Sequence, residues 1–163
     1  MAANTRFATA IHAMGMLAVG EGMNVTSENI ARSVRTNPVV VRRLLSQLTQ
    51  QGLVAMKLGA GGGARLTRPP DQITLADIYR ALDEGPLFQI PILGERHECA
   101  VGRSVGPVIT GVLFEVEKGL LAELQAVTLA DVIGKVMRRM KREDCAPNEQ
   151  RKVAVRPRKR IDG

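Results

Sequence analysis

The chain has 163 residues, and its 45% apolar and 24% charged residues are typical of one globular domain with appendages rather than two large domains. Aromatic residues make up 2% of the chain, which is too few for a surface that stacks RNA bases. The core must therefore be built from aliphatic side chains. The two cysteines, Cys99 and Cys145, are too few for a disulfide framework or a four-thiolate metal site, and they indicate a reducing compartment.

The formal net charge of +7 is unevenly distributed along the chain. Residues 135–163 hold 11 basic and 4 acidic residues, which accounts for the whole excess. Residues 28–68 hold seven basic residues and one acidic residue, Glu28, whereas residues 69–134 hold four basic and ten acidic residues. The folded part is therefore predicted to have a positive end and a negative end, and the positive end suits a polyanion.

The apolar stretch 7–20 is predicted to form an amphipathic core helix, because its apolar side chains recur at helical spacing and Thr5 can cap its start. The stretch is too short for a transmembrane span and is interrupted by Thr9 and His12. It also resembles the apolar region of a signal peptide, but the helical spacing favours the core helix. We therefore expect no membrane contact and a cytoplasmic protein.

Residues 25–51 are predicted to form two short helices joined by a tight turn. Thr26 is a good N-cap for a helix over 27–34, whose apolar residues share one face. Asn37 followed by Pro38 then starts a second helix, because a capping side chain precedes a proline at the first turn, where its missing N–H is harmless.

The second helix is predicted to have an apolar inner face and a polar outer face. At 100° per residue, the inner face collects Val41, Leu44, Leu45 and Leu48, and the outer face collects Val39, Arg42, Arg43, Ser46, Gln47 and Gln50. Such an outer face supplies donors to base edges and phosphates with no carboxylate to repel them, as a major-groove reader requires. The alternative is an ordinary solvated helix face.

Two strand-like runs, 53–58 and 64–68, flank a glycine-rich segment and predict a β-hairpin wing. The wing would bring basic side chains and bare backbone N–H groups to the phosphates or the minor groove, with Lys57, Arg65 and Arg68 as the candidates. A dinucleotide-binding loop would need a helix directly after the glycines, and a Walker loop would need Gly-Lys-Ser/Thr; the sequence has neither.

A third helix is predicted to begin at Thr74, with Asp77 completing the cap. Residues 83–106 then lose helical periodicity and contain several prolines and glycines, which predicts a long loop. Long loops are uncommon in compact domains unless they have a function. This loop carries His97, Glu98 and Cys99.

Residues 107–127 are predicted to form a long helix with an apolar stripe, whose members are Val105, Ile109, Val112, Val116, Leu120 and Leu124. We expect this stripe to pair with its copy in a homodimer, which would set two recognition helices about 34–36 Å apart. Packing within one chain is the alternative. A second Thr-Leu-Ala-Asp, at 128–131, caps a helix to about Met140, and residues 141–163 are expected to form a disordered basic tail that strengthens DNA binding.

Four segments together resemble the Rrf-two family of bacterial winged-helix regulators: TSENIARSVRTNPVVVRRLLSQLTQQGLV, GAGGGARLTRPP, TLADIYRAL, and the CAVG before the long helix. The resemblance covers about residues 1–135. It implies a dimeric transcription factor, usually a repressor, that binds a short palindrome in double-stranded DNA. By the same resemblance, DNA contacts come from the start of the recognition helix and the wing, here Thr36, Asn37, Pro38, Val39, Arg42, Arg43 and the stretch 57–65.

The sequence departs from the family pattern at the cysteines. Cluster-binding members carry three cysteines in the loop before the dimer helix, whereas this loop has Cys99 alone. We therefore expect no cofactor, although His12, His97, Glu98 and Cys99 could supply mixed ligands to an iron-sulfur cluster, and His12 is more typical of a packed core residue. Cys99 is a candidate thiol switch, and an inert cysteine is the alternative.

These observations predict a mainly α fold with a small β-hairpin wing, organised as a winged helix-turn-helix with a long dimerisation helix. The expected divisions are a DNA-binding domain at 1–83, a loop at 84–106, the dimerisation and following helices at 107–140, and the tail at 141–163. The predicted function is sequence-specific DNA binding by a homodimeric repressor, not catalysis; a protein-interaction adaptor is the alternative. The predicted DNA contacts are Thr36, Asn37, Pro38, Val39, Arg42, Arg43, Ser46, Gln47, Lys57, Gly61, Gly62 and Arg65.

Overall fold

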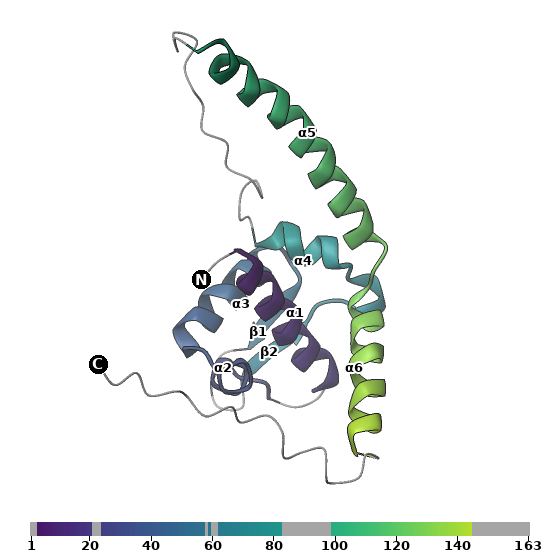
Figure 1. Cartoon of the computed structure of the whole chain (residues 1–163). Coiled ribbons are helices and arrows are strands. Elements are labelled where there is room, and N and C mark those ends of the chain that lie inside the picture. Colours follow the sequence, from purple (N-terminus) through teal and green to yellow (C-terminus); the bar gives the residue numbers. More distant parts are fainter. Residues whose placement is uncertain (1–2, 21–23, 58, 60–61, 83–98, 145–163) are drawn as a thin grey trace, which may run out of the picture.

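A computed structural model describes residues 3–20, 24–57, 59, 62–82 and 99–144 of the chain. Four helices and a hairpin form a rounded head; one long helix extends away from the head, and the last helix lies along its side (Figure 1). The elements in chain order are α1 (Ala3–Val19), α2 (Ser27–Val34), α3 (Pro38–Gln50), β1 (Val54–Lys57), β2 (Gly63–Leu66), a 3-10 turn η1 (Pro70–Gln72), α4 (Leu75–Ala81), α5 (Ala100–Gln125) and α6 (Leu129–Asp144).

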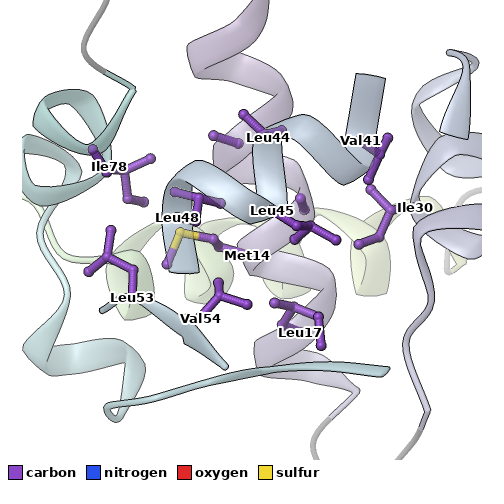
Figure 2. Close-up of a cluster of buried hydrophobic side chains, with 14 of the residues drawn as sticks. Met14, Leu17, Ile30, Val41, Leu44, Leu45, Leu48, Leu53, Val54 and Ile78 are labelled. Atoms are coloured by element: carbon purple, nitrogen blue, oxygen red, sulfur yellow. The ribbon is translucent and has the colours of Figure 1, made fainter. Parts of the chain in front are cut away.

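The core of the head is aliphatic, as the composition predicts. Side chains from α1, α2, α3, β1 and α4 converge on one cluster (Figure 2), which includes Met14, Leu17, Ile30, Val41, Leu44, Leu45, Leu48, Leu53, Val54 and Ile78. All four residues predicted for the inner face of the second helix are buried in it. Burial of such side chains contributes about 1.5–3 kcal/mol each, so this cluster fixes how α3 sits on the head.

The helix-turn-helix forms as predicted, with both helix starts capped. Thr26 Oγ1 accepts from the backbone N–H of Asn29, and Asn29 Oδ1 accepts from the backbone N–H of Thr26, which closes a reciprocal cap at the start of α2. At its end, Arg35 adopts the left-handed conformation (φ 54°) and the Thr36 N–H donates to the Ala31 carbonyl at 2.9 Å. These contacts define the turn that aims α3 away from α2.

The wing is a two-stranded antiparallel hairpin in which Val54 pairs with Leu66 and Lys57 with Gly63. The segment before α2 joins it, because the Ala64 N–H donates to the Val25 carbonyl at 3.0 Å. A Cβ on Gly63 would lie 3.0 Å from that same carbonyl, so only glycine fits this approach without a shift. The hairpin is thereby fixed to the head at its base.

The two Thr-Leu-Ala-Asp segments, which the sequence presents as separate helix starts, meet in the structure. Thr74 and Thr128 face each other in an antiparallel bridge, and each begins a reciprocal cap with the aspartate three residues later. The Leu75 N–H donates to the Val127 carbonyl at 2.9 Å and the Leu129 N–H to the Ile73 carbonyl at 2.8 Å. The starts of α4 and α6 are therefore joined through backbone atoms, beside the end of α5.

Two predicted helix starts were wrong. α1 begins at Ala3, so Thr5 is not its cap; the Thr5 carbonyl accepts instead from the Thr9 hydroxyl inside the helix. α5 begins at Ala100, before the predicted start at residue 107, and Pro107 lies within it; the preceding Gly106 has no Cβ to clash with the proline ring.

α6 continues to Asp144, so the disorder predicted from residue 141 was wrong for 141–144, where Lys, Arg and Glu favour helix. The rest of the predicted tail and most of the predicted loop lie outside the described residues. Among the described helices, none has the length and apolar character to cross a membrane.

Candidate nucleic-acid interface

The face of α3 that points away from the core is polar and basic. Val39, Arg42, Arg43 and Ser46 are exposed along it, while the opposite face is buried. The sequence of α3 contains no acidic residue. This face therefore offers cationic and hydroxyl donors on a rigid helix, which suits contact with phosphates and base edges.

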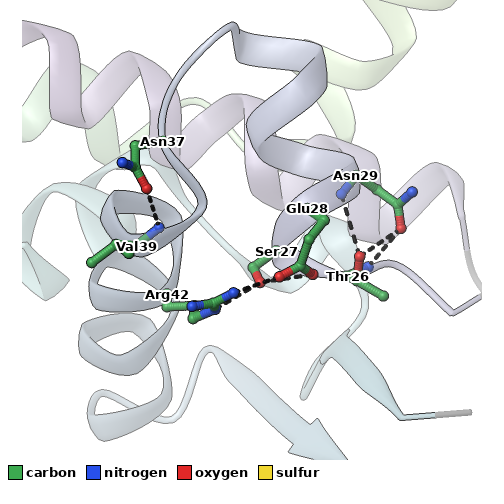
Figure 3. A network of polar contacts seen from close by, with 7 residues as sticks. All are labelled: Thr26, Ser27, Glu28, Asn29, Asn37, Val39 and Arg42. Atoms are coloured by element: carbon green, nitrogen blue, oxygen red, sulfur yellow. Dashed lines mark hydrogen bonds and ion pairs between the residues drawn. The ribbon is translucent and has the colours of Figure 1, made fainter. Parts of the chain in front are cut away.

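The start of α3 is set by Asn37. Its Oδ1 accepts from the backbone N–H of Val39 at 2.8 Å (Figure 3), so the amide group of Asn37 faces away from the helix with its donors outward. Asn37 is exposed, and its neighbours Thr36 and Pro38 are half-buried. Of the residues predicted to contact DNA at this turn, Asn37 thus has the most accessible polar group.

Arg42 does not extend freely from α3 but bends back toward α2 (Figure 3). Its Nη2 donates to Glu28 Oε1 at 2.6 Å and its Nε to Ser27 Oγ at 3.3 Å. The Arg42 hydrogen bond is the main reason why the pKa of Glu28 is lowered to about 2, with smaller contributions from a backbone N–H and from the Ser27 and Thr26 hydroxyls. Glu28 is therefore ionised throughout the physiological pH range.

Gln47 is a second predicted DNA contact whose side chain is bonded to another helix. Its Oε1 accepts from Arg6 Nη2 of α1 at 2.6 Å, and the residue is half-buried. Arg6 was not predicted to lie near this surface, because it is 41 residues away from Gln47 in the sequence. Residues Arg6, Ser27 and Glu28 thus join the candidate surface from α1 and α2.

The wing presents its cations on its outward side. Lys57 and Arg65 are both exposed, whereas Val54 and Ala64 are buried. Ala55 pairs with Arg65 in the ladder, and directly paired residues point to the same face, which places Arg65 and Lys57 together. Gly62 is half-buried, its N–H donates to the Gly59 carbonyl at 2.9 Å, and Gly61 lies outside the described residues.

The long helix α5 carries an apolar surface that the head does not cover. Val112 is 53% exposed, and Val105, Val116 and Leu120 are exposed as well, while Ile109 and Leu124 are half-buried. Phe114, which was not in the predicted stripe, is 65% exposed. An exposed apolar row of this length is typical of a protein-protein contact surface.

The thiolates of one chain are too few to hold an iron-sulfur cluster by themselves. The chain has two cysteines against the four ligands of such a cluster, and Cys99, the one described, is an exposed residue at the N-cap of α5. The described residues hold no group of three or more His, Cys, Asp and Glu that could bind a metal. His12 is exposed on α1 and lies 2.8 Å from Ser33 Oγ, so its predicted place in the core was wrong.

Known proteins share both this sequence pattern and this fold. The sequence model of the Rrf2 family, described as an iron-dependent transcriptional regulator, matches residues 3–135. YwnA of Bacillus subtilis, named as an HTH-type transcriptional regulator, is 32% identical over 130 residues, which are 80% of this chain and 96% of YwnA.

Two solved structures extend the similarity to three dimensions. IscR of T. potens is 29% identical with a TM-score of 0.60, over 81% of this chain and 85% of that one. CymR, described as the global cysteine regulator of B. subtilis, is 26% identical with a TM-score of 0.60, over 80% of this chain and 95% of that one. The predicted winged-helix fold is confirmed by this likeness.

Proposed function

The chain belongs to the Rrf2 family of transcriptional regulators, and from this premise we propose that it is a homodimeric repressor that binds a palindromic DNA operator. Its relatives are transcriptional regulators, so the protein is a regulator and not an enzyme. The observation that carries the proposal is the acid-free outer face of α3, held by a buried inner face and flanked by the cationic wing. A recognition helix in the major groove needs such a face.

The dimer is supported by the apolar row on α5. The α5 row of a second copy would cover the α5 row of the first, because an interface around a two-fold axis uses the same patch on both subunits. Two copies of α3 would then reach two half-sites of a palindrome, about 34–36 Å apart. The bound dimer would repress transcription by occupying the site that RNA polymerase needs.

Selection from a random duplex library tests the DNA part of this proposal. A library with about 20 randomised base pairs covers two adjacent half-sites. We expect the enriched sequences to contain an inverted repeat, to bind roughly 1,000-fold or more tightly than a scrambled duplex, and to lose affinity as salt rises. Equal binding to selected and scrambled duplexes would contradict it, and would favour an adaptor that docks a protein partner.

We also propose that the regulator works without an iron-sulfur cluster, because one chain has only two of the four thiolates that such a cluster needs. The test is the visible absorption spectrum of protein purified without oxygen. A colourless preparation that still selects an operator is the expected result. A brown preparation whose absorbance disappears on exposure to air would contradict this part.

Cys99 is the proposed point of redox response, since it is exposed where the loop region meets the dimer helix. Peroxide would convert its thiolate to sulfenic acid with loss of hydroxide, and a second thiol could then displace water to give a disulfide. Operator binding is expected to change after peroxide and to recover with dithiothreitol, and Cys99→Ser should abolish the change. A response that persists in Cys99→Ser would exclude Cys99 as the sensor.

A further inference from the structure

The inference concerns the contact between α2 and the exposed face of α3, and it rests on the proposed function. We propose that Glu28, assisted by Ser27, is a specificity-determining residue that positions the Arg42 guanidinium for one base and withholds it from phosphates. The pair was not predicted from the sequence, where Glu28 is only the single acid in a basic segment.

Arg42 is held at two points, through Nη2 to Glu28 and through Nε to Ser27, and Ser27 Oγ in turn donates to Glu28 Oε2 at 3.1 Å. The three side chains thus close a ring of contacts between two helices whose relative position is fixed by the core (Figure 3). A guanidinium held this way has lost most of its rotamer freedom before DNA arrives, so less is lost on binding.

Arg42 keeps N–H donors that its contacts with α2 do not use. A guanidinium has five N–H groups, and Arg42 uses Nε and one hydrogen of Nη2 on α2. The hydrogens left over lie on Nη1 and Nη2, at the outer end of the group. This end-on pair of nitrogens matches the O6 and N7 acceptors of guanine, the commonest specific contact in the major groove. Guanine is therefore the base that a restrained Arg42 is expected to read.

The charge of Glu28 also affects how Arg42 meets DNA. The Arg42 and Glu28 side chains are 58% and 52% exposed, so both remain within reach of DNA. Glu28 keeps its negative charge at physiological pH because its pKa is lowered to about 2. A carboxylate at 2.6 Å neutralises the guanidinium and repels phosphates, so Arg42 gains little from sequence-independent contact.

Arg43 is the built-in comparison. It is the next residue of α3 and is exposed, and within the described part of the chain no ion pair or hydrogen bond to its side chain is formed. A cation of this kind can follow the phosphates as they are presented. Two neighbouring arginines of α3 therefore differ in their contacts: Arg42 is bonded to α2, and Arg43 is not.

The test uses the full-length protein and the random duplex library with its selected operator and a scrambled duplex as probes. Glu28→Ala releases Arg42, Glu28→Gln keeps an acceptor without the charge, and Asp71→Ala removes one exposed negative charge from η1 as the matched control. Glu28→Ala is expected to bind the scrambled duplex more tightly and to reduce the ratio of operator to scrambled affinity about 10-fold or more. Its salt slope should steepen by about one unit.

A second readout separates positioning from a general effect on the fold. Reselection with Glu28→Ala should yield a consensus that has lost one symmetric base pair per half-site, whereas Asp71→Ala should keep the wild-type consensus. In an Arg42→Ala background, Glu28→Ala should leave the affinity ratio unchanged, because its target is gone. Circular dichroism checks that each variant is folded, and the exposure of Glu28 makes folding the expected outcome.

The possible failures are distinguishable. If the wild-type protein selects a site and Glu28→Ala keeps the same consensus, or changes the ratio no more than Asp71→Ala, this inference is overturned while the proposed function stands. If the wild-type protein selects no sequence, the proposed function fails and this inference fails with it.

Discussion

Substitution of Arg43 tests what a single exposed side chain of α3 contributes to DNA binding. Changing Arg43 to Ala is expected to cost about 1–3 kcal/mol of specific binding if the side chain reads a base, and to weaken operator and scrambled duplex equally if it contacts a phosphate. Titration of both duplexes distinguishes the two roles. Arg138→Ala, which removes the same charge from α6, is the control, and equal losses in both variants would argue against a special role for Arg43.

The carboxyl of Glu28 gives a direct titration of the contact between the two helices. The midpoint of its titration is expected near pH 2 in the wild type and nearer to the ordinary glutamate pKa of 4.5 in Arg42→Ala, because the Arg42 hydrogen bond is the largest cause of the lowered pKa. A lowered carboxyl pKa stabilises the fold above the unfolded pKa and loses this effect as pH falls through the folded pKa. The Arg42–Glu28 ion pair should therefore contribute the same stability at every pH between 5 and 8. Carbon-detected NMR of the side-chain carboxyl checks this, and an unmoved midpoint in Arg42→Ala would contradict it.

Arg35 is the one described residue other than glycine with a positive φ. The left-handed conformation costs an L-residue roughly 1 kcal/mol, which glycine avoids, so Arg35→Gly is expected to stabilise the head by about that amount or slightly less. Arg32→Gly, with the same loss of charge inside α2, should instead destabilise it by about 0.5–1 kcal/mol. Urea denaturation of both variants checks the opposite signs, and two losses of equal size would refute the argument.

At the scale of elements, the joined helix starts at Thr74 and Thr128 are the critical contact between the head and its last two helices. Thr128→Ala removes a cap and is expected to cost about 1 kcal/mol of unfolding free energy. Thr110→Ala, in the middle of α5, should cost almost nothing, because its hydroxyl only bonds the Gly106 carbonyl of its own helix. Thermal denaturation compares the two, and an equal loss in Thr110→Ala would show that the cap has no special role.

The sequence predicted those elements whose ends carry local signals. α2, α3, α4 and α6 begin where Thr26, Asn37, Thr74 and Thr128 cap them, and the inner face of α3 follows from its 3.6-residue period. The starts of α1 and α5 were missed because neither has a side-chain signal that outweighs a misleading one, a threonine in α1 and a proline in α5.

The candidate site was predictable only in part, for a different reason. The exposed residues of α3 follow from periodicity, which is local. The contacts of Arg42 with Glu28 and of Gln47 with Arg6 join residues 14 and 41 positions apart. Such contacts depend on how separate helices pack, and the spacing of residues along one helix does not contain that information.

At the scale of the whole molecule, the proposed dimer makes one position on α5, Val112, decisive. Val112→Asp places a charge in the middle of the α5 row and is expected to give a folded monomer whose operator affinity falls about 100-fold or more, because each half-site is then bound alone. Sedimentation equilibrium checks the mass. Val19→Asp, at a similarly exposed valine of α1, should remain a dimer; a monomer there, or a dimer in Val112→Asp, would contradict the assignment of the interface.

α5 meets the head at one end, beside the junction of Thr74 and Thr128 (Figure 1). The 26 residues of α5 span about 39 Å, and Cys99 lies at the other end. Over that length, a sideways movement of 1 Å at Cys99 corresponds to a tilt of α5 by only about 1.5°. Chemistry at Cys99 would therefore have to shift this end of α5 by several ångströms, or alter how two copies of α5 meet, to affect the DNA-binding surface.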